Sequence, residues 1–168
     1  MKTDAKSELK KILGQYDEKL AEIARRDAAL RAAQEAFPAR FATLKEKTIR
    51  PALQEFVDQL NATGHEASLR DQEETSSPAG GVAFAAIILR IVPKPFAFKN
   101  PETNKSFLEV SFSANRHDRK VAVSSNNTIV NSGGSRGKRG EYDVDGVNED
   151  VVATHVLQTL NEAFSEPR

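Results

Sequence analysis

The chain contains no cysteine among its 168 residues. Disulfide bonds, thiolate nucleophiles and cysteine-ligated zinc or iron–sulfur sites are therefore excluded. Long hydrophobic runs are missing too, since the longest, from Val82 to Leu89, is far shorter than a membrane-spanning helix. The N-terminal residues lack the uninterrupted apolar core of a secretory signal. We therefore expect a cytoplasmic protein with no membrane partner.

A phosphate-binding loop is absent despite a glycine-rich segment at 131–146. A Walker loop needs four residues between its first glycine and a Gly-Lys pair that serine or threonine follows. Here only three residues separate Gly133 from Gly137-Lys138, and Arg139 stands where the hydroxyl is required. The segment does not predict a nucleotide-triphosphate site.

Histidines and carboxylates form no pattern typical of a metal or acid–base site. His65, His117 and His155 lack the four-residue spacing of two ligands on one helix. His155 is expected on the surface or boundary of a helix. Glu109 is the most isolated carboxylate, on the polar face of an expected strand, where exposure to solvent is ordinary. We predict no metal, cofactor or catalytic residue, and a protein that is not an enzyme.

The sequence does contain a long stripe of apolar residues at helical spacing. Residues 7–36 are rich in helix-forming residues and free of proline. Apolar residues recur in steps of four and three, which is typical of a coiled-coil seam or of a helical hairpin. The candidate interface consists of Leu9, Leu13, Tyr16, Leu20, Ile23 and Leu30. The stripe continues through Phe37, Phe41 and Leu44, and pairing within one chain or between chains remains open at this point.

Two prolines divide the helical region that follows. Pro38 removes a helical hydrogen bond and disfavours helical dihedrals in the residue before it, so a second helix is expected to start near it. That helix should reach Asn61, kinked or in two pieces because of Pro51, and either fold back on the first or extend it. Gly64 is a natural C-terminal stop.

After residue 64 the apolar spacing changes to that of strands. Residues 65–74 predict a half-exposed edge strand, and 81–92 predict a central strand buried on both faces. Residues 106–114 alternate, 119–125 and 127–132 predict two short strands divided at Ser-Asn-Asn, and 141–144 predict a last one. A closing helix is expected after Asn148, with its stripe at Val152, Val156, Leu160 and Ala163.

These elements predict an α+β architecture. Long N-terminal helices, as a helical hairpin or coiled coil, would occupy residues 1–63. Residues 64–168 would form a small antiparallel β-sheet meander with one C-terminal helix packed on the sheet. Part of the N-terminal helical region would cover the second face of the central strand.

The zero net charge conceals two opposed segments. Residues 111–140 hold six Lys or Arg and one acid, net +5, whereas residues 141–168 hold one and seven, net −6. The possible anion or nucleic-acid contacts are Arg116, Arg119, Lys120, Arg136, Lys138 and Arg139. They would share one end of the sheet if residues 121–130 formed two strands. Alternatively, the acids that follow would neutralise them.

The long stripe favours a non-catalytic interaction or scaffold protein. It would self-associate into a homo-oligomer, or bind a protein partner, through its N-terminal helices. The alternative is a nucleic-acid-binding protein that uses the cationic turns around 116–120 and 136–139.

Overall fold

A computed structural model of the chain describes residues 2–94, 106–129 and 135–165. The chain divides into two compact units, residues 1–37 and 38–168. The sequence placed the division after residue 63. The difference arises because the second helix, described below, packs on the sheet and belongs to its unit.

The N-terminal region is helical over consecutive elements: α1 (Thr3–Leu44), the π-helical turn η1 (Lys45–Ile49) and α2 (Arg50–Ala62). A helix starting near Pro38 is therefore wrong, and so is the hairpin alternative. Pro38 lies on the exposed side of α1, where water can satisfy the carbonyl group that loses its hydrogen bond.

Pro51 follows the wider turn of η1, in which the Arg50 N–H donates to the carbonyl of Lys45 five residues earlier. Proline is well tolerated there, in the first turn of α2. The helix ends as expected at Gly64, whose φ of +93° is costly for other residues. The His65 N–H donates to the Leu60 carbonyl at 3.1 Å and so closes the last turn.

One five-stranded antiparallel sheet has the order β1-β4-β5-β6-β7. Its strands are β1 (Glu66–Gln72), β4 (Ala86–Val92), β5 (Leu108–Asn115), β6 (Lys120–Asn127) and β7 (Ser135–Tyr142). A ribbon of β2 (Thr75–Ser76) and β3 (Val82–Ala83) interrupts the β1–β4 connection, so the strand expected over 81–92 is two elements. The meander and the edge position of β1 are confirmed.

The strands after residue 119 differ from the prediction. Residues 120–127 form one strand, and the Ser-Asn-Asn stretch expected to turn pairs with β5 on one side and β7 on the other. Residues 135–140, expected in a loop, belong to β7. Cross-strand pairing overrides the turn preference of serine, asparagine and glycine at these positions.

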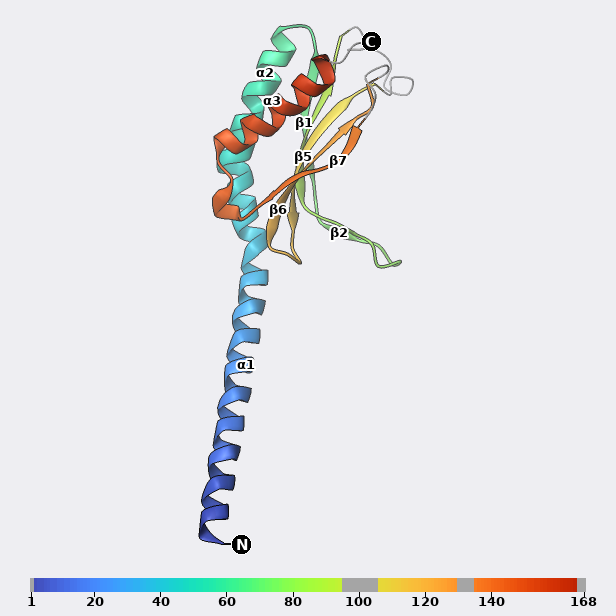
Figure 1. The fold of residues 1–168 in the computed structure, drawn as a ribbon. Helices are drawn as coiled ribbons and strands as arrows, with labels where there is room; N and C mark the ends of the chain where they lie inside the picture. Colours follow the sequence, from blue (N-terminus) through green and yellow to red (C-terminus); the bar gives the residue numbers. More distant parts are fainter. Residues whose placement is uncertain (1, 95–105, 130–134, 166–168) are drawn as a thin grey trace. The chain divides into compact units, whose positions relative to one another are not determined.

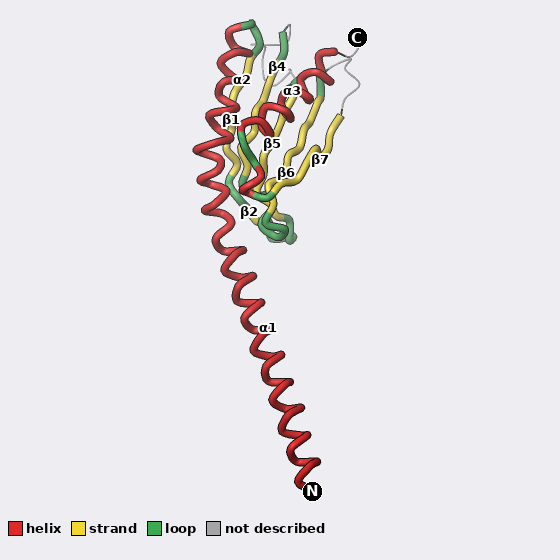
Figure 2. Tube along the Cα trace, turned by 60° about the vertical axis from the view of Figure 1, so that its left-hand side comes forward, coloured by secondary structure: helices red, strands yellow, loops and turns green. Residues whose placement is uncertain are grey.

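Both α2 and α3 (Glu149–Ser165) cover the same face of the sheet, as Figures 1 and 2 show. The register agrees with this arrangement, because Leu89 lies between Leu69 and Val110, which places the inward faces of β1, β4 and β5 together. Helix α2 contacts β1 and β4, and α3 contacts β5 and β6. The expectation that part of the N-terminal helical region covers the second face of the central strand is therefore wrong for the described residues, although Ile88 and Val92 on that face are buried. The packing of α3 on the sheet is confirmed.

The core lies between this face and the two helices. Leu53 of α2 and Val152 and Val156 of α3 are fully buried, as are Leu89 and Phe112 of the sheet. Burial of each such side chain contributes about 1.5–3 kcal/mol. Helix α3 starts as expected, since the Asn148 side chain accepts a hydrogen bond from the Val151 N–H at 2.9 Å.

Candidate functional site

The helical stripe is exposed along the first unit. Seven large apolar side chains of α1 are 43–58% accessible to solvent. They are Leu9, Ile12, Leu13, Tyr16, Leu20, Ile23 and Leu30. Further along the same heptad series, Phe41 is 2% exposed in the core of the second unit. The stripe thus contains one segment that is buried and one that presents apolar surface to water.

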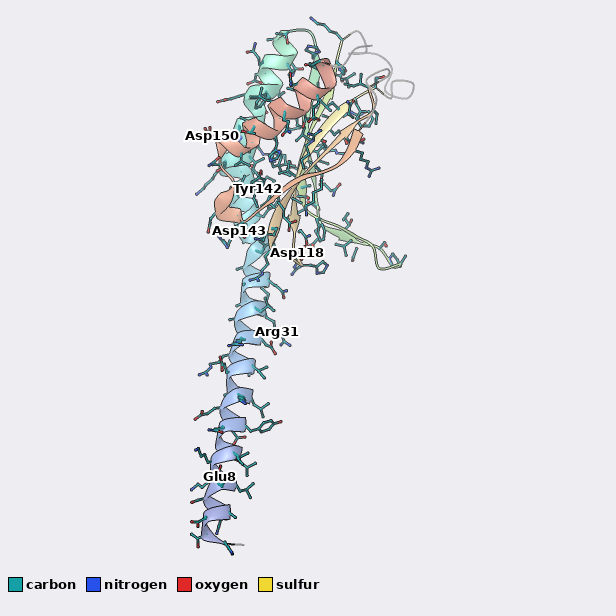
Figure 3. The ribbon with its side chains drawn as sticks, viewed as in Figure 1. Glu8, Arg31, Asp118, Tyr142, Asp143 and Asp150 are labelled. Carbon is teal, nitrogen blue, oxygen red and sulfur yellow. The ribbon has the colours of Figure 1, made fainter. Side chains whose placement is uncertain are left out.

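The first cationic cluster lies in the β5–β6 turn, where Figure 3 labels Asp118. Arg116 reaches Glu74 at 3.3 Å, and Lys120 reaches Asp143, the residue after β7, at 2.5 Å. The Lys120 hydrogen bond is the main reason that the pKa of Asp143 is below its usual value. Arg119 has a left-handed φ of 54° and forms no ion pair within the described part of the chain.

The second cationic cluster lies along the edge strand β7, and a β-bulge divides it. Val123 pairs with Gly140 and Ser124 with Lys138, so Arg139 is the additional residue. The bulge turns Arg139 towards α3, where it binds Glu162 at 2.9 Å and the Ser125 hydroxyl at 2.5 Å. Lys138 pairs with Glu141.

Arg136 is the exception in this cluster, since it forms no ion pair with any described residue. Acids of residues 141–168 thus pair with three of the six cations, namely Lys120, Lys138 and Arg139, and Glu74 pairs with Arg116.

The two clusters do not share an end of the sheet. Because β6 is one strand, the turn at 116–119 precedes it, whereas Arg136 pairs with Asn126 near its far end. The six cations therefore form no single surface at one end.

The face of the sheet opposite the helices carries a groove of about 350 Å³ that the sequence did not predict. Its polar lining includes Arg70, Ser111, Ser124, Asn126, Arg136 and Lys138. Ser111 and Ser124 face each other across β5 and β6. On the same face, Glu109 pairs with Arg90 at 3.5 Å, and the Arg90 guanidinium lies over the Phe107 ring. The alternating polar positions of β5 were the available signal for this face.

His155 is buried, so its expected place on the surface is wrong. Its Nε2 lies 2.5 Å from the hydroxyl of Tyr142, which Figure 3 labels at the end of β7, and its Nδ1 has no hydrogen-bond partner among the residues that the structure describes. Burial, with a smaller contribution from the charge of Arg139, lowers the pKa of His155. The pair is packed tightly, because a Cβ on Gly140 would lie 3.0 Å from the Tyr142 ring.

A second groove, of about 540 Å³, lies where the end of α1 meets the 3₁₀ turn η2 (Val144–Gly146). Leu44, Val144 and Val147 supply its apolar lining, and Arg40 binds Asp145 at 2.8 Å. Asp145 is the one carboxylate of the lining, so the groove holds no pair of carboxylates.

One catalytic sequence motif was missing from the sequence prediction. Residues 133–137 read Gly-Gly-Ser-Arg-Gly, which fits the G-x-S-x-G pattern of a nucleophile elbow. An elbow places its serine at a turn from a strand into a helix. Ser135 instead begins β7 and pairs with Asn127, and β7 leads to η2. This part of the chain lacks the context of the motif.

The described residues contain no group of three or more His, Asp or Glu side chains that could hold a metal ion. Within the same residues, no helix is both long and apolar enough to cross a membrane. Comparisons of the chain with protein-family models, with curated proteins and with solved structures find no match.

Proposed function

We propose that the protein is a non-catalytic, cytoplasmic interaction protein that self-associates through α1. The observation that carries the proposal is the row of seven large apolar side chains that α1 exposes. Soluble monomers rarely expose contiguous apolar patches of more than a few hundred Å². All of them except Ile12 lie at the steps of four and three of a coiled-coil seam, in which Asp27 occupies the position between Ile23 and Leu30, and a second helix would bury this seam.

Light scattering coupled to size-exclusion chromatography tests the proposal. The wild-type chain should elute with at least twice its monomer mass of 18.4 kDa. The L13D/L20D variant should be monomeric, because two charges in the seam cannot be buried without partners. The matched control is A21D/A28D, which adds the same charges on the outer side of the helix and should keep the wild-type mass. A wild-type monomer at all concentrations would refute self-association.

A second candidate function is binding of a nucleic-acid backbone on the face of the sheet opposite α2 and α3. It is favoured by the groove in which Arg136 and Arg70, which form no ion pair with the described residues, lie beside serine hydroxyls and Asn126. Cations that neutralise phosphates release counterions, so such binding weakens steeply with salt.

Fluorescence anisotropy with a single-stranded oligonucleotide tests this second candidate. The R70A/R136A variant should lower the salt dependence by about one unit per cation. The R116A/R119A control, in the β5–β6 turn, should change it little. Absence of binding at low salt with protein in excess would exclude the candidate.

A further inference from the structure

The charges that interrupt the α1 stripe indicate how two copies would pair. In the heptad frame of Leu9 (position d) and Leu13 (position a), Asp27 falls at an a position. In the other direction the series continues to Lys6 and Lys2, at positions a and d. The exposed seam is therefore cationic at one end and carries a carboxylate at residue 27.

A parallel, in-register dimer is disfavoured by these charges. Each a or d residue would then face its own copy, which places Asp27 against Asp27 and Lys6 against Lys6. The flanking positions add to the repulsion, because Arg26 at g would face Arg31 at e of the second helix. Like charges within and beside the seam oppose this arrangement.

One antiparallel register removes every one of these conflicts. In an antiparallel pair, each residue at position a faces a residue at position d of the other helix. The numbers of two facing seam residues add up to the same sum along the whole pair, and this sum identifies the register. With a sum of 29, Leu9 faces Leu20 and Leu13 faces Tyr16 of the second copy. Asp27 then faces Lys2, and at the flanking e positions Lys10 faces Asp17.

The remaining seam layer of this register pairs Ile23 with Lys6, and Ile12 lies beside Lys19. Both contacts cover apolar surface with the aliphatic stems of lysine. Leu30 stays uncovered by the described residues of the second helix.

Antiparallel registers shifted by one or two heptads bring like charges together. A sum of 36 places Asp17 and Lys19 each against its own copy, and leaves Asp27 opposite Leu9. A sum of 43 places Lys10 against Arg31 and Lys19 against Arg26. A sum of 22 places Lys10 against itself and shortens the overlap. Of these registers, the sum of 29 is the one in which no like charges face each other.

We propose that two copies of this chain form an antiparallel coiled coil through residues 3–27 of α1 and the preceding Lys2, with Lys2 of each copy opposite Asp27 of the other. The inference rests on the proposed self-association and adds its orientation and register. The 26 overlapping residues span about 39 Å at the helical rise. The following residues of each helix leave the overlap at opposite ends.

Cysteine cross-linking tests the orientation, and the absence of native cysteine makes any introduced thiol unique. Two variants, L9C and L20C, are prepared with tags of different size and mixed in a glutathione redox buffer. We expect a disulfide between L9C and L20C in the mixture, and no dimer band from either variant alone. A parallel pair would instead give a dimer band from each variant alone, which would overturn the antiparallel register.

A charge exchange provides an independent test. The D27K variant should weaken dimerisation by about tenfold or more, because it places lysines opposite Lys2 at two sites. The K2E/D27K variant should recover most of the loss, since opposite charges again face each other. Weakening without recovery would overturn the register. If light scattering shows only monomer for the wild-type chain, self-association itself is refuted. If the chain is a dimer but L9C or L20C alone gives a cross-linked dimer, only the orientation is refuted.

Discussion

Helices α1 and α3 carry comparable apolar stripes, but the two stripes have different surroundings. On α3, Val152 and Val156 are fully buried, and the helix contacts β5 and β6. On α1, Leu13 and Tyr16 are 53% and 58% exposed. Periodicity identifies which face of a helix must be covered, but it does not identify what covers it. That information comes from the rest of the fold or from a second chain.

The largest expected effect comes from truncating the covered core. Phe112→Ala removes a fully buried ring and should lower the free energy of unfolding by about 3–5 kcal/mol, from lost burial and the cavity left behind. Urea unfolding followed by far-ultraviolet circular dichroism measures it. The matched change on the exposed stripe, Leu20→Ala, should alter the unfolding of the sheet unit by less than about 0.5 kcal/mol. Equal losses in the two variants would contradict the comparison.

A smaller effect should follow the loss of one hydroxyl group. Tyr142→Phe removes the hydrogen-bond partner of His155 Nε2 in a ring whose Nδ1 already lacks one. An unsatisfied buried group costs about 1–3 kcal/mol, and the same urea measurement should show that loss. Tyr16→Phe is the matched control, because Tyr16 is exposed and the chain has two tyrosines. A loss no larger than that of the control would mean that the contact with His155 contributes nothing.

The pH dependence of stability reports on the same pair. Burial lowers the pKa of His155 in the folded state, so the unfolded chain binds more protons. Stability is complete above the unfolded histidine pKa of about 6.5 and falls as the pH decreases through the folded value. Unfolding measured from pH 7.5 to about 5.5 should show the decline, and His155→Gln should reduce it. Burial also lowers the pKa of His65, so His65→Gln is needed to separate the two contributions.

Much of the fold followed from local pattern. The alternation through Val110 and Phe112 predicted a strand with one buried face, and Asn148 and Gly64 marked helix ends correctly. The errors share a cause, which is that distant partners changed a local preference. The local sequence around Asn126 favours a turn, but in the sheet Asn126 pairs with Glu109 on one side and with Arg136 on the other. The groove on the face opposite the helices has the same origin, since its residues come from all five strands of the sheet and only the register brings them together.

The smallest effect should distinguish two ion pairs, one in each region. Arg139 and Glu162 join β7 to α3, with side chains 15% and 44% exposed, whereas Glu22 and Arg26 lie within α1 at 53% and 76%. The hydrogen bond from Arg139 is the main reason that the pKa of Glu162 is lowered. A double-mutant cycle with R139A and E162Q should give a coupling of about 1 kcal/mol, against about 0.3–0.5 for R26A and E22Q.

The two coupling energies differ for a structural reason. The Arg139 guanidinium makes two bonds to one carboxylate and is held by the Ser125 hydroxyl, so little side-chain freedom remains to be lost. Arg26 makes one bond to a neighbour on its own helix and competes with water throughout. Equal couplings, measured at the same ionic strength, would show that the contact between α3 and the edge strand adds nothing to an ordinary surface pair.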